Sequence, residues 1–471
     1  MGQVLDILRE ATRHSPYEER LYLVGGIVRD KVLFPDKASD EDIDIVLEGD
    51  AGELAAFLHE RGIADHAPVT YPRFGTAMIT VAGRQVELVS ARSESYDPAS
   101  RKPDTQPATL AQDVLRRDFT INTLLENLHT GEVRDLTGQA FADMERRTIR
   151  TPLDPGTTFE DDPLRMLRAV RFAARLGFDI HAQTWAAIRE RAHRLEIVSA
   201  ERIRDEFVKI VAGPGAARGL EMLRETGLLD RFAPELSTMH GVAQNIYHVH
   251  DVWTHTLETL EALPHYSRLS LRLAALFHDT GKVETRTVDE QGLVHFYSHQ
   301  TRSAEIARRV MARLRFPHAE TDEVVFLVAM HMRVGDYDAQ WSDAAVRRLL
   351  RDVGDTFDDL VTLTQADKSA ASPETPAVDL DALRAHVSRV KAQLSGRRIT
   401  SPLDGREIIG LLGIEPGPRV GQIKKFLENQ VIEGNLAPGD KETAADLVLR
   451  SFGGEGRLSD GNAKRRESQR D

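Results

Sequence analysis

Short apolar runs separated by polar turns characterise the first third of the chain. The stretches LYLVGG, DIDIVLEG, GTAMITVAG and RQVELVSA alternate apolar and polar positions and are rich in β-branched residues, which predicts β-strands. Between them, GELAAFLHERG has helical spacing and ends at a glycine, which predicts a helix. Residues 1–150 are therefore expected to form a small mixed sheet with helices.

The pattern changes near Pro163, after which the apolar residues recur with the period of a helix. PLRMLRAVRFAARLGF and AERIRDEFVKIVAG are examples, so we expect an all-α neck and body over residues 151–235 and a further all-α domain over 236–395. We expect residues 396–452 to form a C-terminal helical segment, in which the stretch REIIGLLGIEPGPRVGQIKKFLENQVIEG predicts two helices around a Gly-Pro turn. Residues 453–471 carry almost no apolar side chain, which predicts a disordered tail. The predicted class is α+β.

Residues 90–110, SARSESYDPASRKPDTQPATL, interrupt the sheet pattern of the first domain. The segment is polar, contains prolines and is long for a connection, so we expect a mobile functional loop rather than a simple connector.

Composition narrows the classes of protein. The chain of 471 residues has no cysteine, which excludes disulfides and cysteine-ligated zinc and fits a reducing compartment. Its first twenty residues are too charged for a signal peptide, and no run of 18 apolar residues occurs. We expect a cytoplasmic protein that does not enter membranes. The net charge of −13 argues against a protein that coats nucleic acid over its whole surface, and leaves room for a local basic track.

The first chemical pattern joins a glycine pair to two aspartates. Gly25 and Gly26 end a predicted strand and let backbone N–H groups approach a phosphate, because neither residue has a Cβ. Asp42 and Asp44 are two apart on the next strand and share one face, where their carboxylates suit Mg²⁺ and nucleotidyl transfer. Glu87, on a later predicted strand, is a candidate third ligand.

Each part of this pattern also has a plain structural interpretation. The glycine pair can be a tight turn, and the two aspartates can be an exposed strand face. Arg116, beside Arg117 and Asp118, can be a solvated helix end or can hold triphosphate oxygens. The order strand, glycine pair, helix, strand favours a nucleotidyltransferase over these separate explanations.

GGIVRD, DIDIV, RRDFTIN, DDPLRMLRAVRF and ERIRDEF follow in this order between about residues 20 and 235. The series resembles the bacterial (class II) tRNA nucleotidyltransferase and poly(A) polymerase family. The resemblance implies a polymerase-β-type catalytic head followed by helical neck and body domains. It implies that Asp42 and Asp44 carry the metals and that the nucleotide pocket is shaped by Gly25, Gly26, Arg29, Arg116, Asp118 and Asn122.

The stretch FEDDPLR suggests how a base could be selected. Cytosine and adenine each present an amino donor beside a ring-nitrogen acceptor, so a carboxylate and an arginine can accept both and mispair with uracil and guanine. Members of the resembled family use a Glu-Asp-x-x-Arg signature in this way, which implies Asp162 and Arg165 here. The rival explanation makes Asp162 a helix N-cap before Pro163, and the two roles are compatible.

The neighbours of this pair are assigned in the same way. Asp161 occupies the glutamate position of the signature and is a shortened support, while Glu160 is expected to add favourable charge at a helix start. Arg168 and Arg171 continue at helical spacing as a track for tRNA or triphosphate, with a solvated helix face as the alternative.

A second pattern lies in the stretches HDVWTHTL, FHDTGKVET, YSHQTRSAEIA, AMHMR and TQADKSA. One histidine on an apolar helix is usually a core residue, but an adjacent His-Asp pair with further histidines indicates a buried metal site. The set resembles the HD phosphohydrolase superfamily, with Lys282 as a phosphate contact. The resemblance implies an active site that binds Mn, Ni, Co, Fe or Mg through His255, His278, Asp279, His299, His331 and Asp367.

The leading hypothesis is template-independent addition of C and/or A to the 3′ end of tRNA from CTP and ATP with Mg²⁺. The HD site would add a phosphatase or 2′,3′-cyclic phosphodiesterase activity. A poly(A) polymerase of the same fold is an alternative, as is a protein-modifying uridylyltransferase with an HD domain. A non-catalytic RNA-binding module is disfavoured by two metal patterns. The sequence leaves the oligomeric state and the choice among CCA, CC and A addition open.

Overall fold

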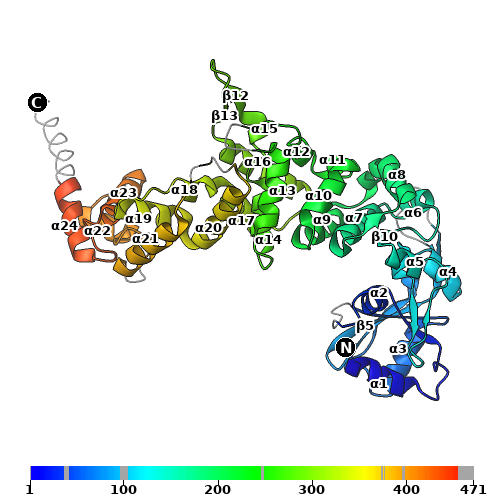
Figure 1. The fold of residues 1–471 in the computed structure, drawn as a ribbon. Helices are drawn as coiled ribbons and strands as arrows, with labels where there is room; N and C mark the ends of the chain where they lie inside the picture. Colours follow the sequence, from blue (N-terminus) through cyan, green and yellow to red (C-terminus); the bar gives the residue numbers. More distant parts are fainter. Residues whose placement is uncertain are drawn as a thin grey trace, which may run out of the picture. The chain divides into compact units, whose positions relative to one another are not determined.

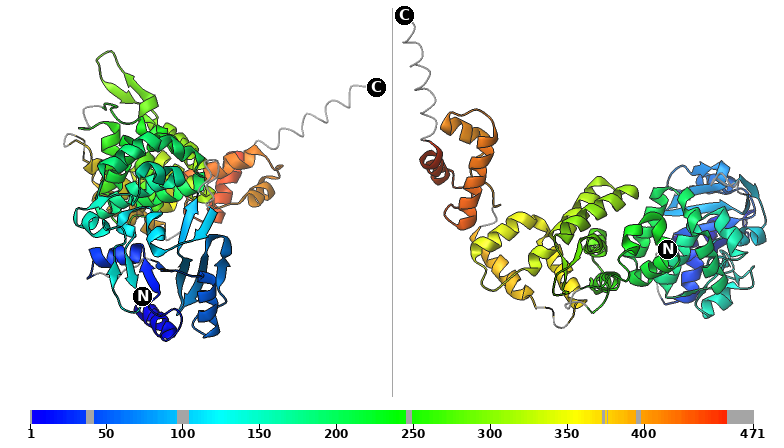
Figure 2. Two further views of the ribbon diagram at one scale, coloured as in Figure 1. Left: turned by 90° about the vertical axis from the view of Figure 1, so that its right-hand side faces the viewer. Right: turned by 90° about the horizontal axis from the view of Figure 1, so that it is seen from above.

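The computed structural model describes residues 2–36, 42–95, 104–244, 249–372, 375, 377–394 and 398–453. The chain divides into two compact units. The first consists of Met1–Gly241 with the segments His265–Arg272 and Arg308–Thr321, and the second of Val242–Pro264, Leu273–Ala307 and Asp322–Asp471. The colours of Figures 1 and 2 follow the chain from the strand-bearing N-terminal part into the helical remainder.

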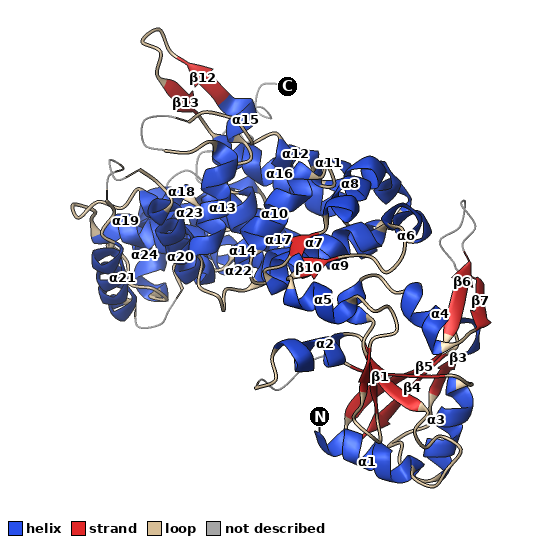
Figure 3. Cartoon of the chain, turned by 45° about the vertical axis from the view of Figure 1, so that its right-hand side comes forward, coloured by secondary structure: helices blue, strands red, loops and turns tan. Residues whose placement is uncertain are grey.

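A seven-stranded sheet forms the head of the first unit, as the sequence predicts, and Figure 3 shows these strands in red. Its order is β3-β4-β5-β2-β1-β8-β9, with β2 and β5 parallel and the other neighbours antiparallel. The strands are β1 (Leu21–Val24), β2 (Ile43–Leu47), β3 (Val69–Tyr71), β4 (Thr76–Val81), β5 (Arg84–Ser90), β8 (Leu125–Asn127) and β9 (Val133–Arg134).

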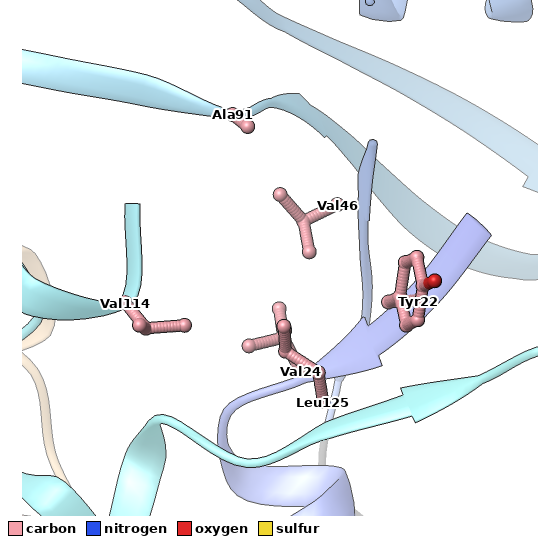
Figure 4. Close-up of a cluster of buried hydrophobic side chains, with 6 residues drawn as sticks. All are labelled: Tyr22, Val24, Val46, Ala91, Val114 and Leu125. Atoms are coloured by element: carbon pink, nitrogen blue, oxygen red, sulfur yellow. The ribbon is translucent and has the colours of Figure 1, made fainter. Parts of the chain in front are cut away.

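One face of this sheet carries a compact apolar cluster (Figure 4). Tyr22 lies opposite Val46 and Val24 opposite Leu125, so the adjacent strands β2, β1 and β8 contribute side chains to it. Val114, on α4 (Leu110–Leu115), packs against the cluster. Asp44 is two residues before Val46 and therefore shares its face of β2. The cluster thus fixes the strand that carries Asp44 and the helix that leads to Arg116.

Helices surround and follow the sheet in the first unit. They are α1 (Gly2–Thr12), α2 (Gly26–Leu33), α3 (Ala51–Glu60), α5 (Ala140–Glu145), α6 (Pro155–Asp161), α7 (Leu164–Leu176), α8 (Ala182–Arg191), α9 (Ala200–Ala212), α10 (Ala216–Glu225), α11 (Leu229–Phe232) and α12 (Pro234–Ser237). The chain order β1, glycine pair, α2, β2 is the predicted one. Helix α7 packs against α9 and α10, and a short parallel pair, β10 (Thr148–Ile149) and β11 (Asp179–Ile180), is added to this helical region.

The helix expected to start at Pro163 does so, but a second helix precedes it. Helix α6 begins at Asp154, whose side chain accepts a hydrogen bond from the N–H of Thr157, and it ends at Asp161. Glu160 therefore lies in the last turn of α6 rather than at a helix start, which corrects the sequence interpretation. It forms ion pairs with Arg191 and Arg194 at 3.3 and 3.0 Å.

The segment expected to be a loop contains a hairpin at its ends. Strand β6 (Arg92–Ser95) pairs with β7 (Asp104–Pro107), from Arg92 opposite Pro107 to Ser95 opposite Asp104. The remaining part of that segment, residues 96–103, lies outside the described residues.

The second unit is helical, with one short addition. Its helices include α13 (Val252–Ala262), α15 (Lys282–Thr285), α18 (Met332–Gly335), α19 (Asp343–Val353), α20 (Phe357–Ser369) and α21 (Leu380–Gln393). It also contains the larger parts of α14 (Leu269–Phe277), α16 (His299–Arg313) and α17 (His318–Met330), whose remaining residues belong to the first unit. The hairpin β12 (Arg286–Val288) and β13 (Val294–Phe296) is inserted between α15 and α16.

The C-terminal segment consists of helices, as predicted. Helices α22 (Gly405–Leu412) and α23 (Pro418–Glu433) flank the Gly-Pro turn, and α24 (Lys441–Phe452) follows. We expected a disordered tail over residues 453–471, and residues 454–471 lie outside the described part of the chain.

Candidate active sites

A cavity of about 590 Å³ opens in the first unit beside the turn that joins β1 to α2. Its lining combines nine arginines with four aspartates, a surplus of positive charge that suits a polyphosphate. Apart from Glu87, every residue that the sequence predicted for the first site lines it: Gly25, Gly26, Arg29, Asp42, Asp44, Arg116, Asp118, Asn122, Asp162, Arg165, Arg168 and Arg171.

The glycine turn brings the backbone close to the proposed metal ligands. Gly25 has φ +82°, which disfavours any side chain, and a Cβ there would lie 3.6 Å from Oδ2 of Asp44. Asp42 and Asp44 line the cavity together, so two hard carboxylate donors suited to Mg²⁺ are present. Glu87 is paired with Asp44 in the parallel register of β5 and β2 but lies outside the cavity lining.

Asp118 organises the wall of the cavity that faces α7. Its Oδ2 accepts hydrogen bonds from Nε and Nη2 of Arg168 at 2.8 and 2.6 Å, and its Oδ1 accepts from Nδ2 of Asn122 at 3.0 Å. Burial acts to raise the pKa of Asp118, but the Arg168 charge and the Asn122 hydrogen bond outweigh it and lower that pKa well below its usual range. Nη1 of the buried Arg29 donates to Oδ1 of Asn122 at 2.9 Å.

Arg116 and Arg117 are held at the edge of the same cavity by a buried acid. Nε of Arg116 lies 2.9 Å from Oδ1 of Asp113, and Nη2 of Arg117 lies 2.9 Å from Oδ2 of the same residue. Asp113 is fully buried in the first turn of α4, next to Val114 of the apolar cluster. The two arginines are therefore held by a buried carboxylate and are not a solvated helix end.

Asp162 and Arg165, the predicted base-reading pair, both line the cavity. Asp162 is the C-cap of α6 and Pro163 is the N-cap of α7, which corrects the predicted N-cap role of Asp162. Oδ1 of Asp162 still accepts from the N–H of Leu164, the first residue of α7, at 3.2 Å. Oδ2 of Asp162 accepts from Nη2 of Arg202 at 3.0 Å. Within the described part of the chain, Arg165 has no side-chain hydrogen bond or ion pair, and it is 8% exposed.

Three of the cavity residues that were missed as functional candidates are charged or aromatic. Arg202 lies on α9 in the quoted stretch ERIRDEF, so a signal for it was present. Phe172 lies in the stretch DDPLRMLRAVRF, where its apolar character favours an ordinary core position. Nothing in the local sequence pointed to Arg92, which reaches the cavity from β6.

The second site lies within the second unit, where buried side chains from several helices converge. His255 comes from α13, His278 and Asp279 follow α14, His299 starts α16, His331 precedes α18, and Asp367 lies on α20. Asp279 joins two groups that could each hold a metal ion, one with His255 and His278 and one with His299 and His331. The ligand atoms within each group lie within 4.8 Å of one another. The five helices thus bring all six predicted ligands to one region.

Backbone carbonyls set the tautomers of these histidines. Nδ1 of His278 lies 2.7 Å from the carbonyl oxygen of Ala275, and Nδ1 of His299 lies 2.9 Å from that of Phe296. Nδ1 of His331 lies 2.7 Å from the carbonyl oxygen of Val328. Because a carbonyl only accepts, each Nδ1 carries the proton and each neutral ring presents Nε2 as a lone pair.

The Nε2 atoms are arranged as metal ligands are. Nε2 of His299 lies 3.3 Å from Nε2 of His331 and 3.3 Å from Oδ1 of Asp279. Two lone pairs that face each other repel unless a cation lies between them. Nε2 of His278 likewise lies 3.2 Å from Oδ2 of Asp279. These donors fit a divalent metal.

The Asp279 carboxylate attracts positive charge to the cluster, which a proton or a metal ion can supply. Burial opposes a charge on His278, but the Asp279 carboxylate outweighs burial and raises the pKa of His278 to about 10. Burial, together with the charge of His278, lowers the pKa of His331 to about 4. Asp279 therefore attracts positive charge. His331 stays neutral, which is the form of histidine that binds a metal ion.

Two further features complete this site. Nζ of Lys282 lies 2.7 Å from Oδ2 of Asp279 and donates to Oε1 of Gln244 at 2.7 Å. A Cβ on Gly281 would lie 2.6 Å from the backbone nitrogen of Ser303 and closer still to the carbonyl oxygen of His299. A glycine at this position therefore allows the start of α16 to approach Asp279.

The sheet of the first unit, with its cavity lined by carboxylates and arginines, is typical of a nucleotidyltransferase. The cluster of histidines and aspartates among the helices of the second unit is typical of an HD domain. Residues 21–150 match the family described as the poly A polymerase head domain. Residues 177–239 match the family described as the probable RNA and SrmB-binding site of polymerase A, and residues 247–372 match the HD domain.

Relatives with assigned names narrow this class. The chain is 35% identical over 357 residues to the A-adding tRNA nucleotidyltransferase of Deinococcus radiodurans. The matched region covers 73% of this chain and 80% of that protein. The chain is 36% identical over 358 residues to the CC-adding tRNA nucleotidyltransferase of Thermus thermophilus, covering 73% and 78%. The chain belongs to the tRNA nucleotidyltransferase family and is an enzyme of that family.

Solved structures share the fold. The CCA-adding enzyme of Bacillus stearothermophilus in complex with CTP has a TM-score of 0.67 at 23% identity, covering 95% of this chain and 97% of that chain. The Thermotoga maritima CCA-adding enzyme complexed with tRNA has a TM-score of 0.57 at 20% identity, covering 96% of each chain. None of the helices that the structure describes is both long and apolar enough to cross a membrane.

Proposed function

We propose that the chain adds C and/or A to the 3′ end of tRNA without a nucleic-acid template, using CTP and ATP at the arginine-lined cavity of the first unit. The observation that carries this is the meeting of Asp42 and Asp44 with the Asp162–Arg165 pair in one cavity. The cavity thus combines carboxylates that suit catalytic metal ions with a pair of side chains that can select the base. The cytoplasm is proposed as its location, because the absence of cysteine fits a reducing compartment.

The residues divide into three roles in this proposal. Asp42 and Asp44 would hold Mg²⁺, with Glu87 as an additional carboxylate from the adjacent strand. When bound, Mg²⁺ neutralises the triphosphate and activates the attacking hydroxyl. The Gly25–Gly26 backbone, Arg29 and the arginines at 116, 168 and 171 surround the triphosphate and hold its oxygens.

Base selection is assigned to Asp162 and Arg165. Asp162 accepts from the exocyclic amino group of cytosine or adenine, and Arg165 donates to the neighbouring ring nitrogen. Uracil and guanine would place acceptor against acceptor and donor against donor, which is costly in a buried site. The absence of a side-chain partner for Arg165 among the described residues leaves its donors available for this task.

The test uses three tRNA substrates that end before the CCA, after one C, and after CC. Each is offered each labelled nucleotide in turn, and the products are resolved by length. We expect incorporation of C, of A, or of both, and no use of UTP or GTP. The pattern over the three substrates separates CCA, CC and A addition. Exclusive use of UTP, untemplated A addition to any RNA, or no incorporation would contradict the proposal.

We further propose that the HD site hydrolyses phosphoesters, as a phosphatase or a 2′,3′-cyclic phosphodiesterase. Its residues would hold a divalent metal (Mn, Ni, Co, Fe or Mg), which supplies an activated water when bound. His255, His278, Asp279, His299, His331 and Asp367 would be the ligands, and Lys282 would contact the phosphate. The support is the set of Nε2 lone pairs fixed by carbonyls around Asp279.

The HD proposal is tested with 2′,3′-cyclic AMP and p-nitrophenyl phosphate in the presence of each metal in turn. We expect metal-dependent hydrolysis of at least one substrate that is lost in Asp279→Asn. Background rates with every metal would contradict an active site.

A further inference from the structure

Phe172 is the shared contact of three arginines in the cavity. The Cζ atoms of Arg171, Arg29 and Arg168 lie 4.2, 5.1 and 5.5 Å from the centroid of its ring. The ring is 5% exposed, so these contacts are largely shielded from water. Cation–π attraction strengthens when the cation is desolvated.

Each of these arginines also has an acidic partner of its own. Arg29 pairs with Asp30, Arg168 with Asp118 and Arg171 with Glu206, each at 2.6 Å. The three acids lie on α2, in the segment after α4, and on α9. Asn122 joins two of these arginines, because it accepts from Arg29 and donates to the Asp118 carboxylate that accepts from Arg168. Arg171 is held by Glu206 on α9.

Three like charges repel, and the ring of Phe172 is a contact that all three share, Arg171 included. The negative face of an aromatic ring attracts all of them, and a ring has a fixed size. Resting on the proposed use of nucleoside triphosphates, we infer that Phe172 is a positioning residue that sets the spacing of Arg29, Arg168 and Arg171 for the triphosphate. It acts through the arginines and does not itself touch the reacting atoms.

The neighbouring ring of Phe119 offers a matched control. Its centroid lies 5.9 Å from that of Phe172 in an edge-on arrangement, and it is fully buried. Within the described residues no guanidinium lies over the Phe119 ring. The same chemical change in this ring should alter packing and leave the arginines in place.

The test replaces Phe172 with phenylalanines that carry one, two or three ring fluorines, which weaken the negative face at nearly constant size. Calorimetry measures the binding of inorganic tripolyphosphate with Mg²⁺, a probe without base or ribose. We expect Kd to rise stepwise, by about tenfold with three fluorines, because several cation–π contacts weaken together. The same series at Phe119 should leave Kd unchanged.

Kinetics supply a second readout. Phe172→Leu should raise KM for CTP and ATP by about tenfold with kcat within about threefold, since the triphosphate contacts are loosened. Phe172→Tyr, which keeps the ring, should restore KM.

The outcomes are distinguishable. If the unmodified protein binds neither tripolyphosphate nor CTP, the proposed function itself is contradicted. If it binds both, and fluorination of Phe172 leaves Kd unchanged or acts equally at Phe119, the positioning role of the ring is overturned. A Phe172→Leu variant that loses melting temperature and kcat at unchanged KM would likewise reduce Phe172 to a core residue.

Discussion

Arg168 donates two hydrogen bonds to one oxygen of Asp118, from Nε at 2.8 Å and from Nη2 at 2.6 Å. The contact ties helix α7, which carries Arg165, to the segment of the head that carries Asn122. It therefore couples the base-reading side of the cavity to the side that surrounds the glycine turn.

Replacement of Asp118 by Asn should destabilise the first unit, because Arg168 loses its charged partner. We expect a loss of about 1–3 kcal/mol in the free energy of unfolding, since Asp118 is buried while Arg168 remains in part solvated. Denaturant unfolding of Asp118→Asn, Arg168→Gln and the double variant measures it. Strictly additive effects in this cycle would show that the contact contributes no coupling.

Replacement of Asp162 by Ala should relax the choice of nucleotide. The carboxylate that accepts from the amino group of C or A is lost, so discrimination against UTP and GTP should fall by at least about tenfold. Single-nucleotide incorporation into tRNA measures the ratio of kcat/KM values. Glu160→Gln is the matched control, because this neighbouring acid pairs with Arg191 and Arg194 outside the cavity lining. Unchanged selectivity in Asp162→Ala would leave this residue only its contact with the N–H of Leu164.

Gly281→Ala should disable the HD site without changing a metal ligand. The added Cβ would collide with the backbone at the start of α16 and move His299 away from Asp279. We expect metal affinity to fall by about 10–100-fold, as when support of metal ligands is lost, while nucleotide addition is retained. Metal titration followed by calorimetry measures this loss.

The control for this change is Gly335→Ala at the end of α18. A Cβ there would meet only a methyl of Thr364 at 3.8 Å, an ordinary contact. Equal losses in both variants would mean that the approach at Gly281 is not what holds the site together.

A pH-dependent contact joins α19 to α21. Asp343 accepts from Nε2 of Gln393 at 3.0 Å and from Nε2 of His386 at 2.9 Å, and these hydrogen bonds lower the pKa of Asp343 from 3.8 to about 2. A lowered pKa in the folded state means that the stabilisation is complete above about pH 4 and disappears as the pH falls through about 2.

Asp343→Asn should therefore lower the melting temperature near pH 7 by about 1–3 °C, a small effect because the group is partly exposed. The difference in melting temperature between Asp343→Asn and the unchanged protein should decrease as the pH falls from 4 to 2. Thermal unfolding over this pH range is the measurement, and Asp381→Asn, at a highly exposed acid paired with Arg384, is the control. A difference that is independent of pH would contradict the assignment to the Asp343 carboxylate.

The sequence predicts the strands, the glycine turn and most of the residues that the fold brings together at the two sites, because each depends on local periodicity or on a short motif. Gly25 and Asp44 are examples, since the turn and the strand that hold them have clear local signals. Contacts made across the fold were not predictable in this way. The pairing of Asp162 with Arg202 needs the packing of α7 against α9, and Phe172 resembles any core residue until its three arginine neighbours are known.

Local signals also failed where two helices meet end to end. The acids of FEDDPLR have the composition of a helix start, and Asp162 does contact the first N–H groups of α7. Glu160 nevertheless belongs to the preceding helix, because Asp154 caps α6 and its last turn packs beside α8. Composition alone does not say to which of two adjacent helices a residue belongs.

The most direct measurement of the central claim is single-turnover addition of CMP or AMP to tRNA by Asp44→Asn, with hydrolysis by the HD site followed in the same preparation. Asp44 is the strand carboxylate beside Gly25 and is the proposed Mg²⁺ ligand. We predict that nucleotide addition falls by at least about a thousandfold, as loss of a metal-based contribution of several kcal/mol requires, while HD hydrolysis is unchanged. Addition at an undiminished rate in Asp44→Asn would contradict the account.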